Sequence, residues 1–175
     1  MNQNLFILIH NLSGRFFWLD ELGIFLASYY TYVLVIIALA LPLAYKSWRT
    51  SLLFYCEIFL AGILSRGIFT EIIRFLYNHP RPFAVLNFTP LIPESGNSFP
   101  SGHTAFLFAI ALIIYFWKPK WGWFFFISGL LVGLARIYVG VHWPFDILGG
   151  IVIGLLSGFI IYYLLLEQKN KLLNK

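Results

Sequence analysis

The sequence predicts an all-α integral membrane protein, a helical bundle of about five transmembrane helices with one N-terminal interfacial helix. Of its 175 residues, 60% are hydrophobic and only 11% are charged, whereas soluble domains are about half apolar and about a quarter charged. The apolar residues fall in long runs, near the ~20 residues that a helix needs to cross a bilayer. At this length we interpret residues 1–175 as a single membrane-embedded domain.

The predicted elements follow in chain order. The stretch Asn4–Leu12 is apolar but too short to span, so we expect an interfacial helix there. The candidate spans are Leu22–Ala44, Ser51–Leu76, Gly102–Trp117, Trp121–Tyr138 and Pro144–Leu166. Pro144 suits the first turn of a helix, which supports the start of the last span. The long connection Tyr77–Pro100 is rich in Pro, Asn, Ser and Gly, and loops of this length in compact chains are usually functional or disordered.

The placement of lysine and arginine predicts the orientation. With five spans, the two short turns and the tail lie on one side of the membrane. These three stretches carry Lys46, Arg49, Lys118, Lys120, Lys169, Lys171 and Lys175. Positive loops face the cytoplasm, so we expect a cytoplasmic C-terminus in a multi-pass protein of the bacterial plasma membrane.

The net charge of +5 does not indicate nucleic-acid binding, because the sequence offers no soluble surface for a basic stripe. The lone Cys56 excludes an internal disulfide. Nothing in the sequence indicates an oligomeric state.

Polar chemistry is concentrated in three motifs that fall on the outer side of this topology. One is Arg136-x5-His142-x3-Asp146. A carboxylate four residues after a histidine can hydrogen-bond one ring nitrogen, which fixes the tautomer and leaves the other nitrogen free to attack. The same spacing also fits a His–Asp pair that only caps a helix, and this motif alone leaves both interpretations open.

The second motif, Pro100-Ser101-Gly102-His103, opens the third span. Ser101 is a good N-cap, Gly102 lets the backbone approach a ligand, and amides at a helix start attract anions. His103 then stands beside the anion as a candidate general acid. Taken alone, this is also a common loop-to-helix sequence.

The third motif is Arg74-x6-Arg81-Pro82, in which Pro80 and Pro82 bracket Arg81. The planar fork of arginine binds phosphate through paired, charge-assisted hydrogen bonds. An arginine at the membrane edge can instead extend to lipid phosphates, an interpretation that fits Arg74 better than the bracketed Arg81.

Together the motifs resemble those of the type-2 phosphatidic acid phosphatase superfamily of lipid phosphate phosphatases. That pattern is Lys-x6-Arg-Pro, Pro-Ser-Gly-His and Ser-Arg-x5-His-x3-Asp, and every spacing matches here. Arg74 stands in place of the lysine and Ala135 in place of the serine. The compact size and the N-terminal Asn-Leu-Phe-x3-His-Asn-Leu-Ser segment resemble the bacitracin-resistance type of undecaprenyl-diphosphate phosphatase within that superfamily.

The resemblance implies that the protein removes a phosphate from a membrane lipid at the outer face, without a metal or other cofactor. It implies that His142 attacks to form a phosphohistidine and that Asp146 orients it. It also implies that His103 protonates the leaving oxygen and then activates water. The implied phosphate-binding residues are Arg74, Arg81, Ser101, Gly102 and Arg136.

We expect undecaprenyl diphosphate as the substrate, because three arginines supply more positive charge than one phosphate needs. Phosphatidylglycerophosphate and lipid A 1-phosphate are the alternatives. Vanadium haloperoxidases carry the same residues but are soluble proteins, so the five spans argue against them. A lipid-binding or transport protein without enzymatic activity would not need two histidines and an oriented carboxylate.

Four further polar residues have weaker expected roles. Glu71 and Arg74 are three apart on a helix and are expected to pair. Arg66 is a charge inside a span, which is costly and often functional; it could pair with another span, and it has no assigned role. His79 is expected to be a solvated loop histidine, and Glu57 has no assigned role.

Overall fold

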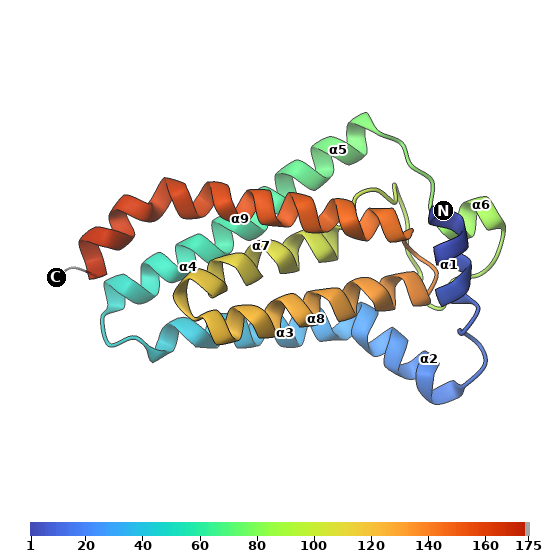
Figure 1. Ribbon diagram of the computed structural model, residues 1–175, viewed down its shortest axis with the longest axis horizontal. Coiled ribbons are helices and arrows are strands. Elements are labelled where there is room, and N and C mark those ends of the chain that lie inside the picture. Colours follow the sequence, from blue (N-terminus) through green and yellow to red (C-terminus); the bar gives the residue numbers. More distant parts are fainter. Residues whose placement is uncertain (174–175) are drawn as a thin grey trace.

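The computed structural model describes residues 1–173, and its long helices run side by side in one bundle (Figure 1). Four helices are long and apolar enough to cross a membrane, Phe17–Ala44, Trp48–Leu76, Pro119–Tyr138 and Pro144–Lys171. A fifth, Gly102–Trp117, is apolar but has only 16 residues. The predicted fold class of a multi-pass helical membrane protein is therefore confirmed. Lys175 lies outside the described residues.

The helices have the following bounds. They are α1 (Asn2–His10), α2 (Phe17–Ile24), η1 (Phe25–Tyr29), α3 (Tyr30–Ala40), η2 (Leu41–Ala44), α4 (Trp48–Gly62), η3 (Ile63–Phe69), α5 (Thr70–Leu76), α6 (Pro82–Leu86), α7 (Gly102–Trp117), α8 (Pro119–Tyr138) and α9 (Pro144–Leu173). The segments α2 to η2 form the first span, and α4, η3 and α5 form the second. The first span begins at Phe17 instead of Leu22, because the helix continues into a more polar and aromatic stretch.

Helix α7, with 16 residues, forms the core of the bundle. Most of its side chains are buried, and it packs against α4, α8 and α9. Glycines on α9 allow that helix to lie directly on the α7 backbone. A Cβ at Gly154 would meet the Ala105 carbonyl oxygen at 2.4 Å, and one at Gly158 would meet the Ala109 carbonyl oxygen at 3.0 Å. Small residues at this spacing are typical of close helix pairs in membranes.

Two of the spans contain a π-helical segment, η1 in the first and η3 in the second. The i to i+5 spacing of η3 appears in side-chain contacts, where the Thr70 hydroxyl donates to the Ser65 carbonyl oxygen at 2.8 Å. Such insertions change which side chains face a neighbouring helix and occur often at functional sites.

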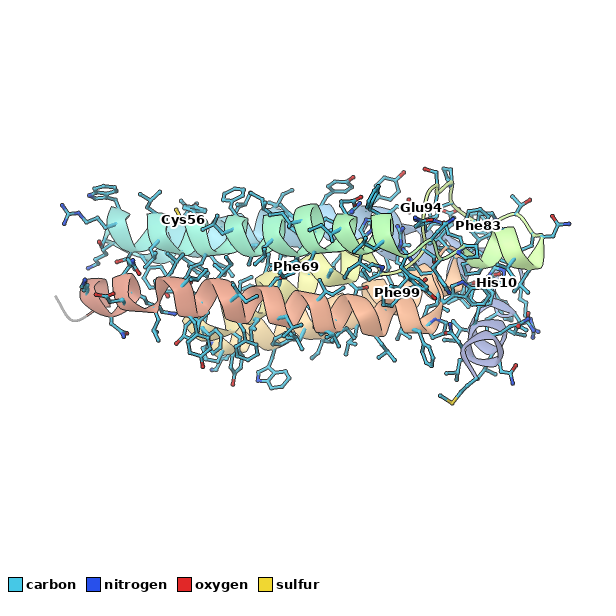
Figure 2. All side chains as sticks on the ribbon, turned by 90° about the horizontal axis from the view of Figure 1, so that it is seen from above. His10, Cys56, Phe69, Phe83, Glu94 and Phe99 are labelled. Atoms are coloured by element: carbon cyan, nitrogen blue, oxygen red, sulfur yellow. The ribbon has the colours of Figure 1, made fainter. Side chains whose placement is uncertain are left out.

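One end of the bundle gathers α1, α6, the loop after α5 and the α8–α9 connection, while the C-terminal end of α9 lies at the other (Figure 1). Figure 2 shows His10, Glu94 and Phe99 at the first end, and Cys56 nearer the second. The predicted N-terminal helix packs across this end, with Phe6 only 1% exposed. His10 is fixed there, because its Nδ1 lies 2.8 Å from the Tyr138 carbonyl oxygen. All three sequence motifs are thereby brought to the same end.

Candidate active site

His142 and Asp146 form the pair that their spacing predicts. His142 lies in the α8–α9 connection with 1% of its side chain exposed, and Asp146 lies in the first turn of α9. His142 Nδ1 donates to Asp146 Oδ2 at 3.2 Å. The same oxygen accepts hydrogen bonds from the Trp143 N–H at 2.8 Å and from the hydroxyl of Ser98. With Nδ1 engaged, the lone pair of the neutral ring is on Nε2.

The other oxygen of Asp146 faces His79. Asp146 Oδ1 is buried without a hydrogen bond and lies 3.6 Å from His79 Nδ1, which is also buried and unpartnered among the described residues. The His79 ring stacks on Tyr77, with ring centroids 5.4 Å apart. The expectation of a solvated loop histidine is wrong, because the loop folds back and turns the ring toward the carboxylate.

The start of α7 lies beside this pair. Ser101 occupies the N-cap position, and its N–H donates to the Asp146 carbonyl oxygen at 3.0 Å. The expected side-chain cap is not formed, because the Ser101 hydroxyl accepts a hydrogen bond from Thr104 at 3.1 Å instead. The first-turn amides of α7, including that of Gly102, are therefore not covered by a capping side chain, which suits an anion.

Arg136 is directed at a carboxylate that the sequence did not single out. Its Nη2 forms an ion pair with Glu94, and its Nη1 donates to the Ala27 carbonyl oxygen at 3.2 Å. Glu94 also lies 3.7 Å from Arg81 Nη2. Burial acts to raise the pKa of Glu94, but the charges of Arg136 and Arg81 outweigh it and lower the pKa. Glu94 is therefore ionised and bridges two arginines.

Arg81 holds the loop in place. Its guanidinium donates to the carbonyl oxygens of Ser95, Gly96 and Asn97 and, across the site, to that of Val141 at 2.9 Å. Burial lowers the pKa of Arg81 to about 10 despite the nearby Glu94, so the group stays charged at neutral pH. Most of its donors are used by backbone carbonyls, and what it offers a ligand is chiefly charge.

Arg74 reaches the second motif, since its Nη2 donates to the Pro100 carbonyl oxygen at 3.0 Å. Its predicted pairing with Glu71 is confirmed, with Nη1 and Oε1 3.6 Å apart. Glu71 lies closer to Arg66, 2.5 Å from its Nη1. Arg66 therefore pairs within its own span and not with another one, because the π-helical segment η3 brings residues 66 and 71 together.

A polar cavity of about 470 Å³ opens beside these groups. His103, Glu94 and Arg136 line one side of it, and Tyr29 and Tyr32 from the first span line the other. Within the part of the chain that the structure describes, no group of three His, Cys, Asp or Glu residues has an arrangement that could hold a metal ion. Positive charge at the site comes from arginine side chains.

The two histidines differ in access. His103 borders the polar cavity, whereas His142 is buried and is not among the residues that line it. Burial lowers the pKa of His142 well below 6.5, and the charges of Arg136, Arg81 and Arg74 lower it further. The ring is therefore neutral and nucleophilic at neutral pH.

The structure brings all eight predicted site residues to one end of the bundle. It adds three that sequence reasoning did not place there, Glu94, Ser98 and His79. Ser98 and Glu94 belong to the long loop, and only the motifs at both ends of that loop marked it as functional. No spacing pattern identifies them individually.

Comparison with known proteins shows consistent similarities. A family model of the PAP2 superfamily matches residues 55–170. Undecaprenyl-diphosphatase BcrC of Bacillus subtilis is 35% identical over 164 residues, which cover 93% of this chain and 83% of the relative. Among solved structures, Aquifex aeolicus LpxE superposes with a TM-score of 0.75 at 32% identity, covering 93% of this chain and 94% of that one. A PAP2-type phosphatidylglycerolphosphate phosphatase from Bacillus subtilis superposes with a TM-score of 0.63 at 29% identity, over 93% and 85% of the two chains.

Proposed function

Since this chain belongs to the PAP2 superfamily and is a membrane-bound lipid phosphatase, we propose that it converts undecaprenyl diphosphate to undecaprenyl phosphate through a phosphohistidine. The observation that carries the chemistry is the hydrogen bond from the buried His142 to Asp146, beside the uncovered start of α7 and two buried arginines. A pair that only capped the helix would not need this surrounding positive charge.

The first half-reaction transfers the terminal phosphoryl group. His142 Nε2 attacks the terminal phosphorus, and the bond between that phosphorus and the bridging oxygen breaks. His103 gives its proton to the departing oxygen, and the lipid monophosphate leaves. The ring of the phosphohistidine carries a positive charge, which Asp146 stabilises through Nδ1–H.

The second half-reaction releases phosphate. The neutral His103 accepts a proton from water, the resulting hydroxide attacks the phosphohistidine, and the Nε2–phosphorus bond breaks. The products are inorganic phosphate and neutral His142, so the cycle consumes one water and needs no other reactant. Arg136, Arg81, Arg74, Ser101 and the Gly102 amide stabilise the equatorial oxygens of both transition states.

The carboxylate of Glu94 occupies the position that a phosphate needs. It already pairs with Arg136 and Arg81, the two arginines proposed to bind the phosphoryl oxygens. The incoming phosphate therefore replaces Glu94 on these guanidiniums and opens the way to His142. Two arginines that are positioned around a carboxylate can also bind another anion of similar geometry.

The substrate assignment draws on three supports. The relative BcrC is an undecaprenyl-diphosphatase and matches most of this chain. The helical bundle is completed at the site by two short helices, α1 and α6, and two connections, which leave little structure to recognise a sugar or glycerol headgroup. The turns and helix ends that carry Lys46, Arg49, Lys118, Lys120, Lys169 and Lys171 lie at the opposite end of the bundle (Figure 1), which favours a site on the outer face. Lipid A 1-phosphate and phosphatidylglycerophosphate are the second candidates, because lipid A 1-phosphatases and phosphatidylglycerophosphatases are among the relatives of this chain.

The test is a comparison of kcat/KM for undecaprenyl diphosphate, phosphatidylglycerophosphate, phosphatidic acid and lipid A in one detergent. We expect the diphosphate to be preferred, and His142→Ala to abolish turnover of every substrate while the protein still folds. Rapid quenching should trap acid-labile, base-stable phosphate on His142. A preference for any other lipid refutes the substrate, and a His142→Ala variant that keeps a tenth of the activity refutes the covalent mechanism.

A further inference from the structure

Arg66 has no role in the proposed reaction, although it lies against the active site. Its guanidinium packs on the first residue of α7: a Cβ at Gly102 would stand 2.5 Å from Arg66 Nε and 2.8 Å from its Cζ. Its side chain is 43% exposed. Among the described residues its one hydrogen-bond partner is Glu71, and a guanidinium has five N–H donors. Arg66 therefore has donors to offer at the edge of the phosphate site.

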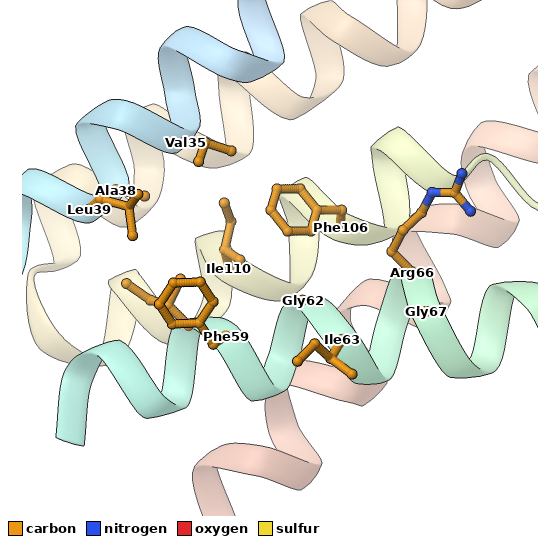
Figure 3. A pocket seen from close by; sticks show the side chains of 11 residues that line it. Val35, Ala38, Leu39, Phe59, Gly62, Ile63, Arg66, Gly67, Phe106 and Ile110 are labelled. Atoms are coloured by element: carbon orange, nitrogen blue, oxygen red, sulfur yellow. The ribbon is translucent and has the colours of Figure 1, made fainter. Parts of the chain in front are cut away.

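Arg66 also marks the polar end of an apolar cavity. This cavity, of about 310 Å³, lies between α3, the α4–η3 helix and α7. Val35, Phe59, Phe106 and Ile110 are among its lining residues, and Arg66 stands at the end near the start of α7 (Figure 3). A charged side chain that faces an otherwise apolar cavity within a membrane span is costly unless a ligand pairs with it.

The apolar and the polar cavity are lined by successive turns of the same two helices. On α7, His103 lines the polar cavity, and Phe106, one turn later, lines the apolar one. On the first span, Tyr32 lines the polar cavity and Val35 the apolar one. The two cavities follow one face of each helix, because residues three apart lie on the same side. A ligand with a charged head and a slender apolar tail could place its head in the polar cavity and its tail in the apolar one.

We infer that Arg66 binds the tail-side phosphate of a lipid diphosphate, whose first apolar units lie in the cavity below it. The inference rests on the proposed function and names the group that separates diphosphate from monophosphate substrates. When the terminal phosphoryl group moves to His142, the tail-side phosphate becomes the leaving group and gains charge. Arg66, close to Gly102, stabilises that charge as it develops.

The ion pairs of the site support two separate anion positions. Glu94 bridges Arg81 and Arg136, and Glu71 lies between Arg66 and Arg74. Each pair of arginines is arranged around one carboxylate. A diphosphate supplies two linked anions, one for each pair, whereas a monophosphate supplies only one. Arg74, which also stabilises the phosphoryl oxygens, then contacts both phosphates, and Arg66 is the arginine nearer the lipid tail.

The experiment compares farnesyl diphosphate with farnesyl phosphate, which share a tail, using the purified full-length protein. We expect Arg66→Gln to lower kcat/KM for the diphosphate by about 10- to 100-fold, the cost of about 1.4 to 2.7 kcal/mol at 1.36 kcal/mol per decade. The value for the monophosphate should change less than about threefold. Arg66→Lys should keep most of the preference, and Arg49→Gln, which changes an arginine packed on Trp48 away from the site, should change neither substrate.

Binding supplies a second readout that does not depend on turnover. Arg66→Gln should weaken inhibition by a farnesyl methylenediphosphonate about as much as it lowers diphosphate turnover, and should leave inhibition by orthovanadate unchanged. An equal loss for both substrates, or no loss for either, overturns the inference. A wild-type protein that cleaves neither substrate refutes the proposed function, and unaltered methylenediphosphonate binding in Arg66→Gln then refutes the role of Arg66 separately.

Discussion

Replacing Asp146 by asparagine tests the catalytic proposal most directly, because it removes one charge and keeps the size of the side chain. The amide oxygen of the new side chain can still accept hydrogen bonds from the Trp143 N–H and the Ser98 hydroxyl, which now meet Asp146 Oδ2. The amide nitrogen then takes the place of Oδ1, which has no hydrogen-bond donor in the structure. The fold should therefore tolerate the change.

The expected loss follows from the charge that forms on His142. A positive ring and a carboxylate oxygen 3.2 Å apart attract each other by about 5 kcal/mol at an effective dielectric constant of about 20. At 1.36 kcal/mol per decade this is slightly less than four powers of ten in rate. It is an upper value, because the neutral amide keeps part of the interaction. We expect kcat to fall by roughly 10²- to 10⁴-fold, as for orienting carboxylates in other nucleophilic enzymes.

Phosphate release at saturating lipid measures kcat, and rapid-quench trapping of acid-labile phosphate measures the first half-reaction. Asp20→Asn is the matched control. Asp20 lies at the same end of the bundle and accepts hydrogen bonds from the Tyr138 hydroxyl at 2.6 Å and from the Gly14 N–H. That variant should keep turnover within about threefold. If Asp146→Asn turns over within tenfold of the wild type and forms phosphohistidine at the normal rate, the proposed role of Asp146 is refuted.

Four further outcomes are expected. Glu94→Gln should lower the thermal unfolding midpoint by about 4–8 °C, because two buried arginines lose their ion pairs at a cost of about 2 kcal/mol. The same variant should be stabilised more by orthovanadate than the wild type is. Weaker vanadate binding would contradict the displacement of Glu94 by phosphate. Because burial and the neighbouring arginines lower the pKa of His142 below 6.5, its phosphorylation should not slow between about pH 7.5 and about pH 6, and a decline in the rapid-quench burst would argue against a neutral nucleophile. Excess EDTA should leave turnover intact while orthovanadate inhibits competitively as a transition-state mimic; a loss that magnesium restores would count against the arginine-based mechanism. In a Cys56→Ser background, Ser95→Cys should react with a membrane-impermeant maleimide in intact cells and Lys171→Cys only after lysis, and the reverse pattern would place the site in the cytoplasm.

The fold was predictable because burial in lipid leaves a direct mark on composition. Apolar runs located every span, including α7, whose 16 residues are few for a crossing. The start of the first span was harder to predict. Residues Phe17 to Glu21 carry two charges and three aromatic or aliphatic side chains. This composition is typical of a membrane interface, although the helix already includes these residues. Neither π-helical segment was predicted, because residue patterns do not distinguish π from α turns within an apolar helix.

The candidate site was predictable where its geometry is local. The His142–Asp146 hydrogen bond follows from a spacing of four at a helix start, and the structure forms it. Contacts that depend on how the long loop folds left no such pattern. Glu94, Ser98 and His79 reach the site through the path of the chain between two spans, which the sequence does not encode as a periodicity. The capping role expected of Ser101 failed for a different, local reason, because Thr104 competes for its hydroxyl.

The arrangement of charge also explains how four arginines can lie together at one end of the bundle. Four arginines gathered at the end of a membrane bundle repel one another and lose hydration. Glu71 and Glu94 each lie between two of them, which offsets the repulsion and orients the guanidiniums. A substrate must compete with these carboxylates for the same donors, so part of its binding energy is used to displace them. A diphosphate brings two anions to that competition, and we therefore expect a site balanced in this way to favour it over lipids with a single phosphate.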